Sequence, residues 1–325
     1  MSSSAEGRTI LVVHGERKTQ RAVHRILGST ACEIDTVADA AEGLRAIHQR
    51  APALIVLDYR MATGEAGLAL AHAAARAGTR ACLLLVGESD PGDVPKLFEH
   101  GALTNLLAHP MPILAEELAV TAMKLLSGDI FGLEKYLAWG AEPRVCELVD
   151  AAERAEVVEA FADDVRGFGL GPRVASMATL VADELLSNAL FDAPVDDEGR
   201  RFRAGEPRGR SRPLAGRERV LLRYACDARY LALEVTDLFG TLQRETIVEY
   251  LARAARRGAG DTQVDLEGTG AGMGIALSYS CCTHLVYNLS WGHRTQVIAL
   301  IDLRFKPGAR SPVASFNVFV EEAAA

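Results

Sequence analysis

The sequence predicts two domains of different architecture, a doubly wound α/β domain followed by an α+β sandwich. Its 325 residues are enough for two domains of ordinary size, and 49% of them are hydrophobic, as in chains that build full cores. Residues 8–127 alternate apolar runs with helical stretches, whereas residues 174–305 combine helices with paired strands. We expect a helical connector at 128–173 and a C-terminal tail at 306–325.

Five apolar runs predict the sheet of the first domain. Near-continuous apolar strands that alternate with helices indicate a parallel sheet covered on both faces. The runs lie at 10–13, 34–37, 54–57, 83–86 and 105–107, and the helical stretches lie at 23–27, 40–48, 67–76 and 94–100. In a domain of this kind, ligand chemistry occurs at the carboxyl ends of the strands.

Asp58 ends the third run, in the sequence LIVLD, and is the candidate reactive residue of the first domain. An Asp at this place can accept a phosphoryl group, bind a metal ion, or only cap the next turn. The segments ILVVHGE, LIVLD, LLLVGESD and GALTNLLAHP follow one another in the order and spacing of response-regulator receiver domains. This resemblance covers residues 8–127 and implies a flavodoxin-like fold with Asp58 as phosphoacceptor.

The residues that would support phosphorylation differ from those of a receiver. The resemblance implies two acidic residues after the first strand, a Ser or Thr after the fourth, and a Lys after the fifth. This chain has His14 and Gly15, followed by Glu16, then Val86, and finally His109. Phosphoryl transfer needs cations beside the phosphoryl oxygens, and Mg²⁺ prefers carboxylate ligands that a His-Gly pair lacks. We therefore predict a pseudo-receiver that ordinary phosphorylation does not switch.

A long helix in the second half places Glu184 and Asn188 on one face. Helices are expected at 174–190 and 245–256, and strands at 220–225, 230–236, 285–289 and 295–303. Glu184 and Asn188 are four residues apart, and the apolar Val181, Leu185 and Ala189 lie beside them. A pair of this kind usually belongs to a solvated face, but beside apolar positions it can also reach into a pocket.

Asp237 ends a predicted strand in which Leu231, Leu233 and Val235 share its side. This alternation directs the carboxylate along an apolar face, where an unpaired charge is costly. The exocyclic amine of adenine would satisfy it. The alternative is that Asp237 only caps the turn that leads to Gly240.

A glycine-rich segment, EGTGAGMGIALSY, leads into an apolar helix. Its glycines are Gly268, Gly270, Gly272 and Gly274. Such a turn leaves backbone N–H groups free to meet phosphates at a helix N-terminus. A dinucleotide-binding GxGxxG is disfavoured because no βαβ unit surrounds the segment, and the GxxxxGK[ST] sequence of a P-loop is absent from the chain.

The order ELLSN, TDLFG and GTGAGMG resembles the N, G1 and G2 boxes of the GHKL ATPase superfamily over residues 150–305. The resemblance implies a Bergerat-type sandwich that binds ATP and Mg²⁺. Glu184 would polarise the attacking group, Asn188 would hold Mg²⁺, Asp237 would bind adenine, and the glycines would line the phosphates. The usual DxGxG of the G1 box is altered here, with one displaced glycine, Gly240.

The two domains together imply a bacterial signal-transduction protein of the two-component type. No His occurs between His109 and His284, which excludes a conventional histidine kinase. The second domain is nearer to the anti-sigma-factor kinases. Our leading hypothesis is an ATP-binding output domain that acts through a protein partner, with a homodimer also expected. The alternatives are an active protein serine kinase or ATPase with Glu184 as base, and a scaffold without catalysis.

Composition excludes several other classes. The net charge of -8 argues against nucleic-acid binding. We expect no apolar run to approach the roughly 20 residues of a membrane span, and MSSSAEGRT lacks the core of a secretory signal, so we expect a cytoplasmic protein. The six Cys have no ligand spacing. Residues 200–219 contain eight Arg and predict a flexible, solvated insertion, or else a contact for nucleotide phosphate or an acidic partner.

Overall fold

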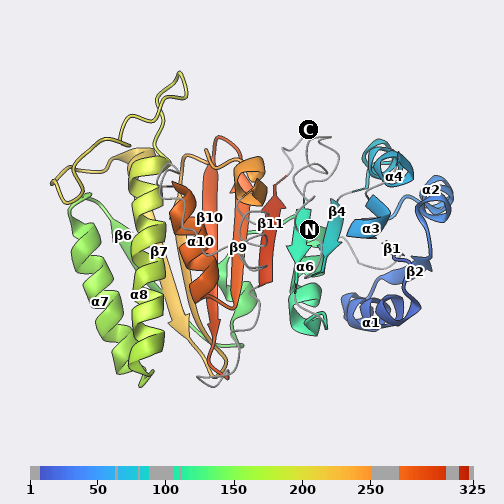
Figure 1. Ribbon diagram of the computed structural model, residues 1–325, viewed down its shortest axis with the longest axis horizontal. Coiled ribbons are helices and arrows are strands. Elements are labelled where there is room, and N and C mark those ends of the chain that lie inside the picture. Colours follow the sequence, from blue (N-terminus) through green and yellow to red (C-terminus); the bar gives the residue numbers. More distant parts are fainter. Residues whose placement is uncertain are drawn as a thin grey trace, which may run out of the picture. The chain divides into compact units, whose positions relative to one another are not determined.

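The chain divides into two compact units in a computed structural model (Figure 1). The structure describes residues 8–62, 65–79, 81–87, 105–109, 112–249, 271–304 and 315–321. The first unit is Met1–Ile130 with Asn317–Val320, and the second is Phe131–Phe316 with Glu321–Ala325.

The first unit is built on a parallel sheet. Its strands are β1 Thr9–Val13, β2 Glu33–Val37, β3 Leu54–Asp58, β4 Ala81–Val86 and β5 Asn105–Ala108, in the order β2-β1-β3-β4-β5. Its helices include α1 Arg17–Leu27, α2 Ala40–Gln49, α3 Tyr59–Ala62, α4 Glu65–Arg76 and α6 Ala115–Ser127. Strands β1 and β4 are buried at every position because helices cover both faces of the sheet. The predicted parallel α/β sheet is confirmed, and the order of its strands is that of flavodoxin. The helix predicted at 94–100 lies outside the described residues.

The segment expected as a C-terminal tail, 306–325, contains a strand, β11 Ser315–Val320, so this prediction is wrong. All six of its residues are buried. Within the first unit, Asn317 Nδ2 donates to Glu117 Oε1 at 2.8 Å, and the Val320 N–H donates to Asn105 Oδ1 at 3.2 Å. The Phe and Val residues of SFNVFV favour a strand.

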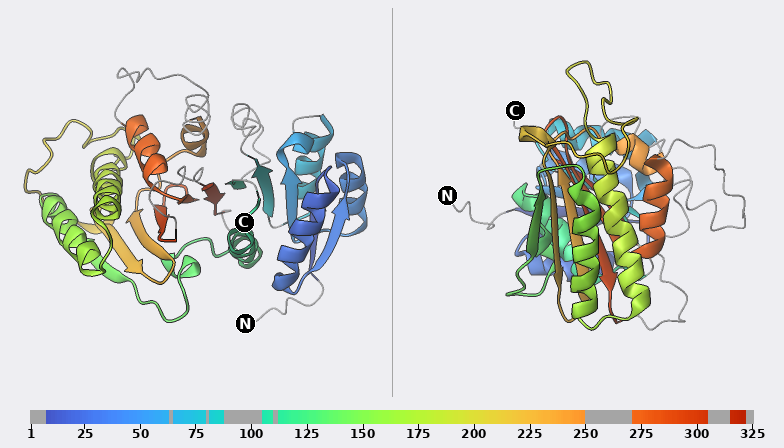
Figure 2. Two further views of the ribbon diagram at one scale, coloured as in Figure 1. Left: turned by 60° about the horizontal axis from the view of Figure 1, so that its bottom comes forward. Right: turned by 90° about the vertical axis from the view of Figure 1, so that its left-hand side faces the viewer.

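The second unit contains an antiparallel sheet with helices on one face. Its strands are β6 Arg144–Leu148, β7 Val220–Cys226, β8 Tyr230–Asp237, β9 His284–Ser290 and β10 Arg294–Asp302, in the order β9-β10-β8-β7-β6. Helices α7 Glu153–Gly167, α8 Pro172–Ser187 and α10 Ala271–Cys281 pack together on this sheet. They are the green, yellow-green and orange helices in the right-hand view of Figure 2. The predicted strands at 220–225, 230–236, 285–289 and 295–303 are confirmed.

The opposite face of this sheet carries polar side chains that a short segment covers. Glu234 and Gln296 alternate with residues that face the helices. The 3₁₀ turn η3 Leu133–Tyr136 contacts β8, and the N–H of Gly132 donates to Gln296 Oε1 at 3.0 Å. The segment before α7 therefore closes the face that the helices leave open.

The predicted helical connector, 128–173, also needs correction because it contains β6. This strand is an edge strand with mostly exposed or half-buried residues, such as Val145. Since neither face of β6 is fully buried, its sequence has no apolar run or alternation that would predict a strand. The rest of the segment is largely helical, as expected, because α7 fills residues 153–167.

Helix α8 continues into a π-helical turn, Asn188–Asp192, so the predicted helix at 174–190 is confirmed. Among the described residues, one helix, Pro172–Asp192, is long enough and apolar enough to cross a membrane by length and composition. This differs from our expectation that no apolar run reaches this length. More than half of it is buried inside the second unit. It contacts α7, α10, β8 and β10, which is the position of a core helix.

Candidate functional site

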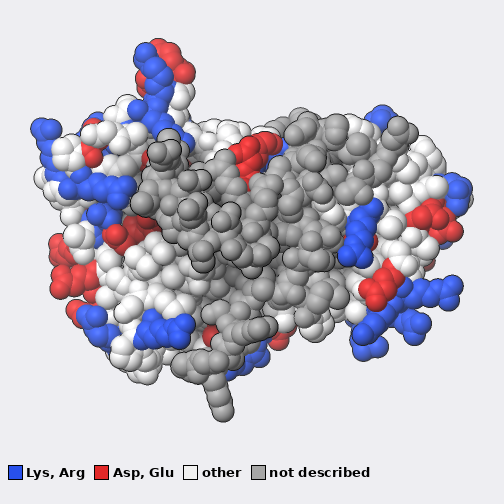
Figure 3. Space-filling model, viewed as in Figure 1, with Lys and Arg blue, Asp and Glu red and all other residues white. Residues whose placement is uncertain are grey.

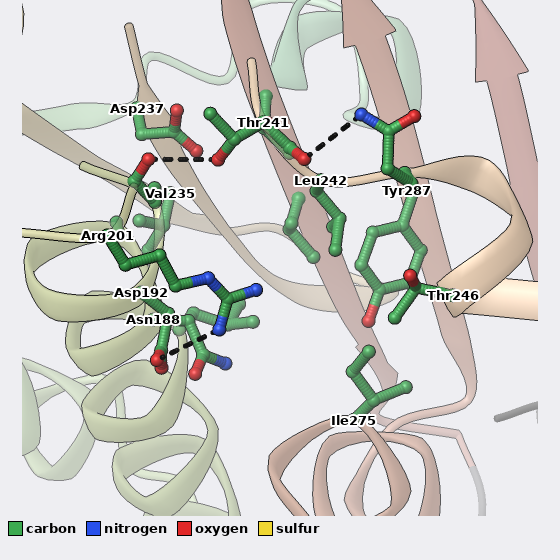
Figure 4. Close-up of a pocket in the computed structure, with 16 residues that line it drawn as sticks. Asn188, Asp192, Arg201, Val235, Asp237, Thr241, Leu242, Thr246, Ile275 and Tyr287 are labelled. Carbon is green, nitrogen blue, oxygen red and sulfur yellow. Dashed lines mark hydrogen bonds and ion pairs between the residues drawn. The ribbon is translucent and has the colours of Figure 1, made fainter. Parts of the chain in front are cut away.

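A cavity of about 130 Å³ lies between the helices and the sheet of the second unit (Figure 4). Its apolar walls come from α8, α10, β8 and β10, and its polar groups come from the ends of α8 and β8, from β9 and β10, and from two loops. The polar residues that line it are Asn188, Asp192, Arg201, Asp237, Thr241, Gln243, Thr246, Tyr287 and Thr295. Apolar walls with a few converging polar groups are typical of a small-molecule site.

Asp237 is the buried acid of this cavity, with 6% of its surface exposed. It is the last residue of β8, and its Oδ1 accepts hydrogen bonds from the N–H groups of Phe239 at 2.9 Å and Gly240 at 3.0 Å. Burial raises the pKa of Asp237, and these two bonds and the contacts with Thr295 oppose that rise. Asp237 therefore does both things that its place in the sequence predicts: it caps the turn and it faces a pocket.

Thr295 and Tyr287 belong to the site, although no sequence signal identified them. Thr295 stands opposite Asp237 in the register of β10 with β8. Tyr287, in β9, is 1% exposed, and among the described residues its hydroxyl has no hydrogen-bond partner. Burial raises the pKa of this hydroxyl. A buried polar group without a partner is costly unless a ligand or water satisfies it.

Glu184 and Asn188 lie on one face of the helix, as the sequence predicts. Asn188 lines the cavity, whereas Glu184 lies next to it and is half-buried. Burial raises the pKa of Glu184, while the polar side chain of Asn188 and the positive charge of Arg208 lower it. The pair thus combines an amide at the cavity wall with a half-buried carboxylate whose pKa is raised.

Two of the predicted glycines are sites of close approach. Gly274 is buried within α10, and a Cβ at this position would overlap the carboxylate of Glu184. Gly240 has φ +61° and packs against the backbone of the turn between β9 and β10. Gly272 lies in α10, and Gly268 and Gly270 lie outside the described residues. The structure therefore brings the ELLSN helix and the glycine-rich helix into direct contact.

Most residues of the arginine-rich segment 200–219 are exposed, as expected of a solvated insertion, but specific contacts hold parts of it against the rest of the second unit. Arg203 is fully buried, and its Nη2 lies 2.7 Å from Glu218 Oε1. Arg217 donates to the backbone oxygens of Leu238 and Gly292. Lys and Arg side chains gather on the projecting loop at the upper left of Figure 3.

Asp58, at the end of β3, has few of the neighbours that phosphorylation requires. Its side chain is 15% exposed, and Nε2 of His14 lies 3.8 Å from its Oδ1. The carboxylate of Glu16 instead accepts a hydrogen bond from Thr19 Oγ1 at 2.7 Å, at the start of α1. No group of three His, Cys, Asp or Glu residues that could hold a metal ion occurs in the part of the chain that the structure describes. His109 is buried, and its N–H donates to the backbone oxygen of Val86.

Comparisons with known proteins find similarity to receiver domains. No protein-family model and no curated protein matches the chain. A response regulator receiver domain protein from Clostridium thermocellum has 19% identity over 37% of this chain and 94% of its own, with a TM-score of 0.32. The receiver domain of NtrX from Brucella abortus has 28% identity over 36% and 98%, with a TM-score of 0.31. A response regulator receiver protein from Sinorhizobium medicae has 17% identity over 38% and 98%, with a TM-score of 0.32.

Proposed function

We propose that this chain is a bacterial signal-transduction protein in which a pseudo-receiver is joined to an ATP-binding unit of the GHKL type. The ATP-binding unit acts through a protein partner in the cytoplasm. The observation that carries the proposal is the buried carboxylate of Asp237 at a cavity that also contains the hydroxyl of Tyr287, which has no hydrogen-bond partner in the described part of the chain. The antiparallel sheet with helices on one face, and the contact between Glu184 and Gly274, support the same assignment.

The cavity is too small for a whole nucleotide. An apolar cavity of roughly 150 Å³ in another protein binds benzene, and the cavity here measures about 130 Å³. It would therefore take only part of the base, with the acceptor Asp237 facing the exocyclic amine of adenine. The sugar and phosphates would extend out of it, past Asn188, whose side-chain oxygen would hold Mg²⁺. Bound ATP would supply a transferable phosphoryl group.

Titration of the full chain with ATP and with GTP, in the presence of Mg²⁺, tests this proposal. We expect ATP to bind at least about tenfold more tightly, because guanine presents a carbonyl where adenine presents the amine that Asp237 accepts. Equal binding of the two nucleotides, or none of either, contradicts the proposal. Comparing phosphate release by wild type and Glu184→Gln then separates binding alone from turnover, since Glu184 is the candidate base.

We expect that acetyl phosphate with Mg²⁺ leaves Asp58 unphosphorylated. The reason is that His14 stands next to Asp58, whereas Mg²⁺ requires oxygen ligands. The measurement is acid-labile phosphate per chain, with Asp58→Asn as the background control. Stoichiometric phosphate on wild type overturns the pseudo-receiver assignment.

A gain-of-function variant sharpens this experiment. His14→Asp combined with Gly15→Asp supplies two carboxylates, and a Cβ at position 15 has the Met61 methyl group, at 3.3 Å, as its nearest contact. We expect this double variant to acquire Mg²⁺-dependent phosphate on Asp58. Failure of the double variant would place the defect elsewhere, beyond the loss of acidic ligands.

A further inference from the structure

The arginine-rich segment reaches the mouth of the cavity from outside the three sequence motifs. An isolated bridge between Val195 and Arg201 holds the backbone of its first part. Phe202 packs edge-on against Phe239, with ring centroids 6.4 Å apart, and Phe239 belongs to the turn that Asp237 caps. Together with the buried Arg203, these contacts fix the loop against the same turn that places the buried acid.

Arg201 brings a guanidinium group to the cavity wall. Its Nη1 lies 3.6 Å from Asp192 Oδ1, and Figure 4 shows the side chain extending from this acid toward the cavity. About half of the Arg201 side chain is exposed. A partly exposed ion pair of this kind is weak, so that the guanidinium can exchange its carboxylate for a stronger anion.

Arg208 adds a second cation on the same side of the site. Its guanidinium lies over the ring of Phe191, 6.0 Å from the centroid, and its charge lowers the pKa of Glu184. Among the described residues, Arg208 forms no ion pair with a carboxylate. Two guanidinium groups therefore lie on the side of the cavity that Asn188 lines and that Glu184 adjoins. The phosphates of a nucleotide whose base enters the cavity would extend on this side.

We propose that Arg201 and Arg208 bind the phosphate chain of the nucleotide, so that this loop is a phosphate-binding element of the second unit. This proposal rests on the proposed function, because it concerns the same cavity. A cavity of about 130 Å³ leaves the phosphates outside it, and guanidinium groups bind phosphate oxygens with paired, charge-assisted hydrogen bonds. Asp192 is the partner of Arg201 in the structure, and the phosphates of a bound nucleotide would replace Asp192 as this partner.

Binding of adenosine, ADP and ATP tests this assignment when wild type is compared with the double variant Arg201→Gln, Arg208→Gln. We expect the double variant to bind ATP about tenfold or more weakly, ADP less weakly, and adenosine within about twofold of wild type. Arg210→Gln is the matched control, because Arg210 lies in the same loop and is exposed but, unlike Arg201, does not line the cavity and, unlike Arg208, has no effect on the pKa of Glu184. We expect it to bind all three ligands like wild type.

The outcomes separate this inference from the proposed function. If wild type binds neither adenosine nor ATP, the proposed function fails. If wild type binds ATP and the double variant binds it equally well, only the role of the loop fails. An equal loss for adenosine and ATP also overturns the inference, since it indicates that the loop merely shapes the cavity. Thermal unfolding of each variant checks that the chain is folded, and Arg201→Lys with Arg208→Lys, which retains both charges, should recover part of the ATP affinity.

Discussion

Asp237→Asn is expected to lose most of its affinity for ATP while it remains folded. The amide keeps an oxygen that can accept the N–H groups of Phe239 and Gly240. Its nitrogen, however, is a donor and would face the donor amine of adenine, and such a mismatch leaves two buried groups unpaired. We expect ATP to bind at least about tenfold more weakly. Titration with a fluorescent ATP analogue measures the loss of affinity. Unchanged affinity would mean that Asp237 does not contact the nucleotide.

The same substitution should alter how stability depends on pH. Burial raises the pKa of Asp237 in the native state above its ordinary value of 3.8. At pH values between the ordinary and the raised pKa, the native state therefore binds more protons than the unfolded state. The contribution of Asp237 to the free energy of unfolding therefore falls as the pH rises from the ordinary to the raised pKa. Asp237→Asn removes this loss.

Urea unfolding at a series of pH values measures this effect. We expect the variant to gain stability relative to wild type as the pH rises from the acid range toward neutrality. Glu184 and Glu234 also have raised pKa values, but both proteins contain them, so that the difference between the two curves isolates Asp237. Parallel curves would contradict the prediction.

Gly240→Ala is expected to cause a large loss of stability in the second unit. Its φ of +61° is strained for a residue with a side chain, and its Cβ would overlap the carbonyl oxygen of Ser290. It would also lie 2.8 Å from the amide nitrogens of His293 and Arg294. These are backbone atoms, which move only if the turn between β9 and β10 opens. We expect the free energy of unfolding, measured in urea, to fall by at least about 2 kcal/mol.

Gly292→Ala is the matched control for this prediction. Gly292 has φ +72° in the same turn region, and nothing lies within 4 Å of a Cβ built there. It therefore shows the cost of the left-handed conformation alone, about 1 to 2 kcal/mol. An equal loss for Gly240→Ala and Gly292→Ala would mean that the close approach to Ser290 has no energetic effect.

The sequence predicts most of the strands that the structure describes, but misses β6 and β11. β1 and β8 are buried at every position, so hydrophobicity identifies them. β6 is an exposed edge strand without a pattern, and β11 is a short strand within a stretch expected to be a tail. The positions of β6 and β11 depend on pairing with strands far away in the chain, which local sequence does not encode.

The candidate site could be predicted only where one element contains the signal. Glu184 and Asn188 follow from helical spacing, and Asp237 follows from alternation along a strand. Thr295 and Tyr287 join the site through the register of β8 with β10 and of β10 with β9, which no single segment reveals. The position of Arg201 depends on how a long loop folds back on α8, and composition indicates only that the loop is basic.

Gly274 brings helix α10 into direct contact with Glu184 of helix α8. Because Gly274 has no side chain, the backbone of α10 packs directly against the carboxylate of Glu184 in α8, and this contact limits the orientations of the carboxylate. A movement of α10 that placed a side chain at this point would push the carboxylate aside. The position of α10 therefore sets the orientation of the Glu184 carboxylate, and a shift of this helix would change that orientation.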